Sequence, residues 1–155
     1  SLVGMHAMDS LRIEKAYRHW GHDITDEDTP LQAGLGFALA WDKPGGFIGR
    51  EALLHQKAEG IDRRLVQFLI QDPEPVAYGN EPIWRNGQLA GRTSSAAYGH
   101  TLGGCVALGY VAQPKGADAS FILDASYEIE IAKRRYPAKA SLRPMWDPTG
   151  ARMKT

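Results

Sequence analysis

The chain lacks three features that would each indicate a class of function. It has a single cysteine, Cys105, among 155 residues, so an internal disulfide framework is excluded. It has no excess of either charge, because 18 Lys and Arg residues balance 18 Asp and Glu residues, whereas nucleic-acid-binding surfaces are usually basic. It also has neither an apolar run of about 20 residues nor a signal-peptide pattern. We therefore expect a soluble, intracellular protein that binds neither nucleic acid nor a membrane.

What is present suffices for a packed core. Hydrophobic residues make up 43% of the chain and charged residues 23%, which is typical of a globular protein. The length suggests one domain, or one small domain plus part of another. Cys105 lies in the apolar stretch CVALGYV, where we expect a small buried residue and not an activated thiol. Residue 1 is Ser and a helical pattern begins almost at once, so we expect a piece of a longer protein.

The first 60 residues predict two helices and one strand. Apolar spacing predicts a helix over residues 7–17, with Arg12 beside its apolar stripe. A second helix is predicted over residues 50–59, with Gly60 as its C-terminal cap. Between them, large apolar residues alternate with Gly and Ala over residues 35–41, which is a strand pattern.

The remainder of the chain reads as short strands. Asn86 and Gly87, between two runs of alternating residues, are a strong β-hairpin signal. Further strands are predicted in RLVQFLI, in CVALGYV and twice in YEIEIAKRRYPAKASL. Five or six short strands with Gly-rich turns predict a small barrel or sandwich.

Two familiar kinds of active site find little support. His19 and His22 have a spacing that two metal ligands can use, but Gly21 lies between them and no HExxH or CxxC motif accompanies them, so we expect no metal site. Ser94 and His100 could be combined with an aspartate into a triad, but the GxSxG nucleophile motif is absent. We expect no hydrolase triad.

Three residues remain as candidates for ligand binding. An arginine that borders an apolar stripe needs a carboxylate or ligand partner, or else its head extends to solvent along its own stem. For Arg12 the residue pattern alone favours the second alternative. Trp20 and Trp41 flank the small-residue stretch and could form the walls of a pocket for a flat ligand, although each tryptophan could equally be a packing residue.

Several blocks, taken in order, resemble one known family. SLRIEKAYRHWGHDI, DTPLQAGLGFALAWDK, FIGREAL and GQLAGRTSSAAYGHTLGGCVALGYV are similar to segments of the aminomethyltransferase family. That family includes the glycine-cleavage T-protein and the folate-binding part of sarcosine and dimethylglycine dehydrogenases. The ending PMWDPTGARM resembles the dehydrogenase branch most. The resemblance covers practically the whole chain.

The resemblance implies an α+β fragment of a three-lobed protein. Residues 1–50 would be the end of a mixed α/β middle lobe, residues 51–63 a linker helix, and residues 64–155 a small antiparallel β-barrel domain. The implied activity is transfer of a one-carbon unit from a methylamine or aminomethyl donor to tetrahydrofolate. The absent N-terminal lobes would then be partners of this chain. A non-catalytic folate-binding or regulatory relative, or a purely structural barrel module, is the alternative.

The resemblance also changes the role that we expect for the candidate residues. Arg12 matches a family arginine of the folate pocket, so it is now expected to bind folate, together with Trp20 and Trp41. Glu14 is expected to hold a loop or Arg12. No catalytic residue is expected in this chain, because the family's aspartate lies in a region that it does not match. FAD, if used, would belong to an upstream domain. The expected location is the cytoplasm, or the mitochondrial matrix in a eukaryote.

Overall fold

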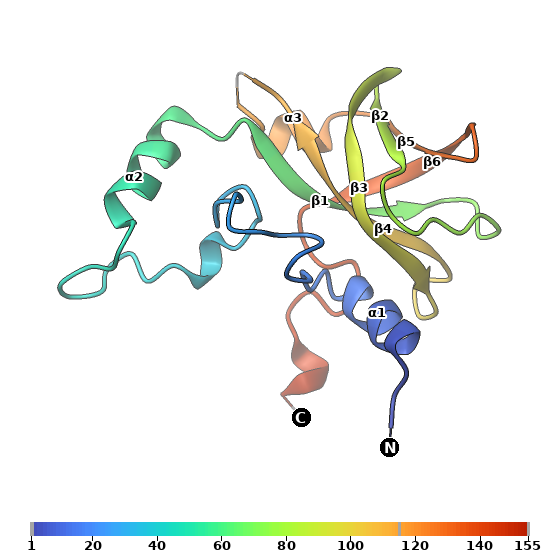
Figure 1. Cartoon of the computed structure of the whole chain (residues 1–155), viewed down its shortest axis with the longest axis horizontal. Helices are drawn as coiled ribbons and strands as arrows, with labels where there is room; N and C mark the ends of the chain where they lie inside the picture. The colour runs from blue at the N-terminus through green and yellow to red at the C-terminus, as the bar shows by residue number, and fades with distance from the viewer. Residues whose placement is uncertain (1, 115, 155) are drawn as a thin grey trace.

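A computed structural model of the chain describes residues 2–114 and 116–154. The first residue of the expected 1–50 segment and the last residue of the expected 64–155 segment lie outside the described residues. Figure 1 shows a β-barrel built from the second half of the chain and, beside it, a segment of loops and one helix that reaches away from the barrel. We call this segment, residues 21–60, the arm.

Six antiparallel strands form the barrel. They are β1 (Arg63–Ile70), β2 (Pro82–Arg85), β3 (Gln88–Gly99), β4 (Gly104–Ala112), β5 (Tyr127–Ile131) and β6 (Arg134–Ser141). They are paired in the order β1-β4-β3-β2-β5-β6, and β6 pairs with β1 to close the barrel. The predicted antiparallel barrel is therefore confirmed. Closure gives the first and last strands a partner, so neither of them is left as the open edge of a sheet.

Two of the hairpin turns have the same backbone shape but different sequences. In the β2–β3 turn, Asn86 and Gly87 have φ angles of 48° and 78°, as a two-residue hairpin of type I′ requires. This turn confirms the hairpin prediction. In the β5–β6 turn, Ala132 and Lys133 have φ angles of 49° and 67°. Pairing of the flanking strands therefore holds two ordinary residues in the left-handed region.

Alternate residues of the strands face two different apolar clusters. Val66 and Phe68 of β1 lie in the barrel interior, where the Phe68 ring packs on the Tyr127 ring at 5.2 Å between centroids. Leu65 faces outward and packs against Ile13 of the first helix. Each fully buried large apolar side chain contributes roughly 1.5–3 kcal/mol of stability. Strands β1 and β4 thus contribute side chains both to the barrel core and to the contact with the first helix.

The first helix, α1 (Met5–Glu14), ends three residues earlier than predicted. The helix ends because Ala16 adopts a left-handed conformation with φ 52°. Its backbone N–H donates to Ile13 O and turns the chain away. Gly4, at the N-cap, supplies no side-chain hydrogen bond.

In the arm, one element is predicted correctly and another is not. Helix α2 (Arg50–Glu59) has the predicted bounds, and Gly60, with φ 89°, caps it. The strand predicted over residues 35–41 is wrong, because the structure has the short 3₁₀ helix η1 (Gly36–Ala38) and turns there. None of the described strands pairs with this stretch, and the Phe37 side chain is 83% exposed. The alternation of large and small residues therefore does not correspond to a buried and an exposed face of a strand.

Two further short helices complete the chain. Helix α3 (Ala119–Leu123) is capped by the Asp118 carboxylate, and its Ile122 joins the barrel core. The C-terminal segment ends in η2 (Ala151–Met153), and before η2 the Trp146 backbone N–H donates to the Glu14 carbonyl at the end of α1. The Lys15 Nζ lies 2.9 Å from the Asp147 carboxylate and links the two.

Candidate functional site

Arg12, the first candidate ligand residue, is held mainly by protein groups. Its Nε donates to Asp9 at 2.9 Å, and its Nη1 donates to Asp23 at 2.7 Å and to the Tyr17 carbonyl at 3.1 Å. Its side chain is 14% exposed, so it does not extend freely into solvent. Nη2 is the only guanidinium nitrogen of Arg12 without a hydrogen-bond partner among the described residues. A ligand could therefore reach Arg12 only through that one nitrogen, unless the ion pairs open.

Asp23 is the centre of this cluster. Its carboxylate is fully buried and accepts hydrogen bonds from Arg12, from the His19 backbone N–H, and from the hydroxyls of Ser94 and Ser95. Both serines lie on β3, about 70 residues along the chain from Asp23, at an irregularity in its pairing with β4. A buried carboxylate needs such compensation. The cluster therefore fixes the loop after α1 to the barrel wall.

Glu14 holds a different loop. Its buried Oε1 accepts from the backbone N–H groups of Thr101 and Leu102 at 2.7 and 2.8 Å. Its own carbonyl accepts from the Gln67 side-chain amide at 3.2 Å. The expectation that Glu14 holds a loop is confirmed, and the loop is the β3–β4 turn.

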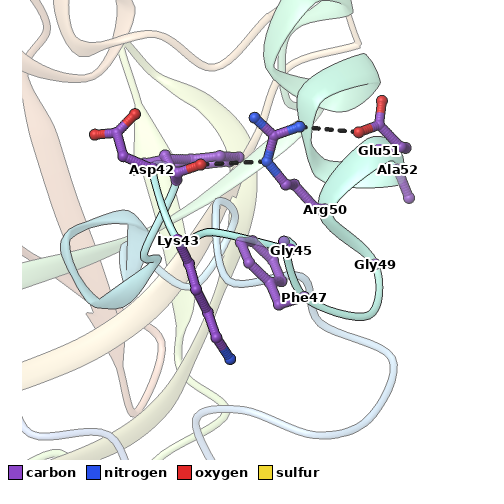
Figure 2. A pocket seen from close by; sticks show the side chains of 10 residues that line it. Asp42, Lys43, Gly45, Phe47, Gly49, Arg50, Glu51 and Ala52 are labelled. Atoms are coloured by element: carbon purple, nitrogen blue, oxygen red, sulfur yellow. Dashed lines mark hydrogen bonds and ion pairs between the residues drawn. The ribbon is translucent and has the colours of Figure 1, made fainter.

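Trp20 and Trp41 lie in different surroundings. Trp20 is 66% exposed, and its backbone forms an isolated parallel β-bridge with Ile24. Trp41 lines a cavity of about 630 Å³ in the arm, formed by the stretch WDKPGGFIGRE (Figure 2). There the Arg50 side chain donates to the Trp41 carbonyl at 3.2 Å, and the Phe47 ring lies 6.2 Å from the Trp41 ring. Neither Arg12 nor Trp20 lines this cavity.

A second cavity brings cationic and aromatic groups together where the arm, the end of α1 and the C-terminal segment meet. It measures about 770 Å³, and its walls include Tyr17, Arg18, Leu35, Phe37, Leu142 and Arg143. Guanidinium groups beside aromatic rings suit a flat ligand that carries carboxylates. Sequence reasoning did not select the two arginines, because neither belongs to a periodic pattern that would mark its face.

Arg18 is fixed in that wall by backbone carbonyls. It donates to Ala16 O at 2.8 Å, to Ala33 O at 3.1 Å and to Gly34 O at 3.3 Å. Burial lowers the pKa of Arg18, and the nearby Asp23 charge opposes that shift. Gly34 has a φ of 68°, which favours glycine, and a Cβ atom there would lie 2.9 Å from the Arg18 Nη2 and displace the end of that side chain.

The histidines and Ser94 play other parts. The rings of His19 and His22 are 4.6 Å apart, and within residues 2–114 and 116–154 no three potential metal ligands gather. The Ser94 hydroxyl donates to the Asp23 carboxylate and also lies 3.2 Å from the Leu108 carbonyl oxygen, so it is engaged in the barrel wall. Across the same residues, none of the helices has both the length and the apolar character to span a bilayer.

Comparison with known protein families assigns the chain to one of them. Residues 63–147 match the model described as the glycine cleavage T-protein C-terminal barrel domain, and residues 1–43 match the one described as the GCVT N-terminal domain. The first match alone spans more than half of the sequence. The chain belongs to the glycine cleavage T-protein family.

Matches to individual proteins support this family assignment. The chain is 46% identical over 153 residues to a 4-methylaminobutanoate oxidase (formaldehyde-forming) of Paenarthrobacter nicotinovorans, and 42% identical over 154 residues to the mitochondrial sarcosine dehydrogenase of Homo sapiens. These matches cover 99% and 98% of this chain but only 18% and 17% of those proteins. Among solved structures, the aminomethyltransferase T of the glycine cleavage system from Bartonella henselae matches with a TM-score of 0.75 and 27% identity, over 92% of this chain and 38% of that one.

Proposed function

We propose that this chain is the C-terminal portion of a tetrahydrofolate-dependent enzyme that transfers a one-carbon unit from a methylamine or aminomethyl donor. The observation that carries the proposal is the match of practically the whole chain to relatives whose names describe oxidation of methylated amines. In this proposal residues 1–50 complete a middle lobe, residues 51–63 link the lobes, and residues 64–155 form the barrel lobe. Its partners are the N-terminal lobes of the same protein.

The chain's own residues would bind and orient folate. Tetrahydrofolate would supply the nitrogen that accepts the one-carbon unit. The cavity of about 770 Å³ fits such a ligand in volume and in its arginine and aromatic walls. Arg12 and the rings of Trp20 and Trp41 do not line this cavity, so their contact with folate is a separate part of the proposal. The proton-moving aspartate, and FAD where the donor is oxidised, would come from other domains, so the chain alone would be inactive.

The test uses the longer protein that carries this chain. With tetrahydrofolate and 4-methylaminobutanoate, sarcosine or dimethylglycine as donor, we expect formation of 5,10-methylenetetrahydrofolate, measured by mass spectrometry. Formaldehyde release that does not respond to tetrahydrofolate for any donor would refute the proposal. The isolated chain is expected to form no product.

A matched pair of variants tests the folate contact. Trp20→Ala removes a 66% exposed ring and should leave folding intact while weakening tetrahydrofolate binding severalfold. Tyr78→Ala removes an 82% exposed ring elsewhere and should leave binding unchanged. Equal affinities of the two variants would remove Trp20 from the proposed site.

One observation favours a second candidate. The chain is also 41% identical over 154 residues to the mitochondrial pyruvate dehydrogenase phosphatase regulatory subunit of Mus musculus. A regulatory or non-catalytic folate-binding protein would bind tetrahydrofolate without forming the methylene product in the same assay. A purely structural barrel module would bind none. For an enzyme of this kind we propose a cytoplasmic location, or the mitochondrial matrix in a eukaryote.

A further inference from the structure

The β2–β3 turn carries two residues whose chemistry the proposed function does not use. Asn86 and Gly87 are both exposed, and a Cβ atom added at Gly87 would meet no atom beyond its chain neighbours within 4 Å. Neither residue lines the two cavities described above. The main-chain nitrogen that follows an asparagine can attack the asparagine side-chain amide, and glycine has no side chain to hinder that approach. The turn therefore holds two groups that can react with each other.

Ser126, 40 residues along the chain, holds the Asn86 side chain in place. The Asn86 Oδ1 accepts a hydrogen bond from the Ser126 backbone N–H at 3.0 Å and another from the Ser126 hydroxyl at 3.1 Å. In return, the Asn86 backbone N–H donates to the Ser126 carbonyl at 2.9 Å. We call these three hydrogen bonds the clasp. The clasp joins the β2–β3 turn to the residue that directly precedes β5.

The clasp leaves the reacting nitrogens free. It engages only the oxygen of the Asn86 amide, because no hydrogen bond within residues 2–114 and 116–154 involves the Asn86 Nδ2. Within the same residues, the Gly87 backbone N–H also donates to no acceptor. Ring closure must move the Asn86 Cγ toward the Gly87 nitrogen, so Oδ1 has to leave its two donors on Ser126 first. Opening of the clasp therefore precedes any reaction of this pair.

We propose that Asn86–Gly87 is a site of spontaneous deamidation and that Ser126 restrains the reaction. Hydroxide removes the Gly87 N–H proton, and the nitrogen attacks the Asn86 Cγ to form a succinimide ring. The bond between Cγ and Nδ2 breaks, and Nδ2 takes a proton from water and leaves as ammonia. A water molecule then opens the ring at one of its two carbonyls. The product at position 86 is an aspartate or an isoaspartate, and nothing is oxidised or reduced.

The two products differ in their effect on the barrel. The aspartate keeps an oxygen that can accept from Ser126, and it adds one negative charge. In the isoaspartate, the main chain runs through the former side chain and gains one carbon between β2 and β3. A two-residue type I′ turn does not accommodate that carbon, so the adjacent pairing of Arg85 with Gln88 is lost first. Deamidation thus gives the barrel a slow, ligand-independent change that begins at one turn.

The test follows both asparagines of the folded chain during incubation at mildly alkaline pH. Asn80 is the internal control, because it is exposed and left-handed like Asn86, with φ angles of 68° and 48°, but precedes Glu81. Trypsin places the two in different peptides, since Arg85 lies between them. We expect mass spectrometry to show conversion of amide to acid, in two chromatographic forms, at Asn86 only. No conversion at Asn86 in the folded chain, or equal conversion at Asn80, would overturn the proposal.

A pair of serine variants tests the restraint. Ser126→Ala removes one hydrogen bond of the clasp, so conversion of Asn86 should be roughly twofold to tenfold faster. Ser141→Ala removes a hydroxyl that donates elsewhere, to the Arg143 carbonyl at 2.7 Å, and should leave the rate unchanged. A thermal melt of each variant confirms that it is folded. Equal rates in the wild-type chain and Ser126→Ala would refute the restraint by Ser126.

The urea-unfolded wild-type chain keeps the test decisive if Ser126→Ala does not fold. Unfolding removes the whole clasp, so Asn86 should convert faster there than in the folded chain. A rate no higher in urea than in the folded chain would likewise refute the restraint. Neither measurement involves a ligand, so the result is independent of the methylene-transfer assay.

Discussion

The barrel and the arm belong to one chain but are stabilised in different ways. In the barrel all six strands are paired and side chains such as Phe68, Ile83 and Ile129 have no exposed surface. In the arm, Phe37 is 83% exposed and none of the residues of α2 is buried. The barrel therefore supplies its own core, whereas the arm is placed by scattered polar contacts. One example is the hydrogen bond of 2.8 Å from the Gln32 side chain to Asp62.

This difference teaches where stability and binding reside. Local opening costs least where few apolar contacts are buried, and ligand contacts are often drawn from such segments. Cavities of about 630, 770 and 450 Å³ include arm residues, whereas two others, of about 500 and 380 Å³, lie along α1. We infer that the barrel is a rigid platform and that the arm is the side on which ligands, or further lobes of a longer protein, complete the structure.

The largest effect is expected from a glycine substitution in the barrel. A Cβ atom at Gly91 would lie 1.9 Å from the Tyr110 carbonyl oxygen on the paired strand. Gly91→Ala should therefore lower the free energy of unfolding by more than about 4 kcal/mol or prevent folding. Gly36→Ala in the arm meets only Leu31 Cδ2 at 3.6 Å and should change it by less than about 0.5 kcal/mol. Urea unfolding measures both, and equal losses would contradict the comparison.

A matched pair of phenylalanines gives the next largest difference. Phe68→Ala removes a fully buried ring and should cost about 3–5 kcal/mol. Phe37→Ala removes an exposed ring and should cost less than about 0.5 kcal/mol. Thermal unfolding of the two variants checks this. A loss of several kcal/mol for Phe37→Ala would show that the arm has a core of its own.

The junction of the two regions is tested at Asp23. Asp23→Ala leaves Arg12 without its buried partner and frees the hydroxyls of Ser94 and Ser95. We expect a loss of about 3 kcal/mol, at the lower end for a broken buried ion pair because Arg12 keeps Asp9. Asp26→Ala, a nearby exposed acid, is the control and should be neutral. Susceptibility of the arm to limited proteolysis should rise only in Asp23→Ala.

The smallest predicted effect depends on pH. Burial opposes ionisation of Glu81, but its hydrogen bonds from the Thr93 hydroxyl and from the N–H groups of Tyr78 and Gly79 outweigh this and lower its pKa. A lowered folded-state pKa gives stability that is present above the unfolded pKa, about 4.3, and is lost as the pH falls through the folded value.

Comparison with Glu81→Gln isolates that contribution. The wild-type chain should be the more stable at pH 7, and the difference should shrink as the pH falls below about 4. Urea unfolding at a series of pH values measures it. A difference that grows in acid would reverse the assigned sign.

The sequence predicts the barrel better than the arm, for a physical reason. In β5, Tyr127 and Ile129 alternate with Glu128 because one face of the strand is buried and the other is not. Residues 35–41 alternate in the same way, but none of the described strands pairs with them, so the alternation does not mark a buried face. Helix α2 was predicted well because its cap, Gly60, acts locally. Elements whose sequence pattern depends on a local cap or on a regularly repeated burial pattern can therefore be predicted from the sequence.

The candidate site was predictable only in part. The motif around Arg12 drew attention to the helix that carries a buried ion-pair cluster, but the partners Asp9 and Asp23 were not anticipated. Arg18 was missed, since a guanidinium in a cavity wall has no periodic signature. Whether Arg12, Trp20 and Trp41 bind folate stays a prediction.

By itself the sequence determined that the second half of the chain forms short strands, and it also determined the α2 helix and the family, because these depend on local pattern and on whole blocks of similarity. Only the tertiary structure decided which polar groups meet. Asp23 and Ser94 are far apart in the chain but share a hydrogen bond, and Arg64 lines a cavity together with Gln56 of another element. Such encounters follow from barrel closure and from the path of the arm, which no local sequence pattern encodes.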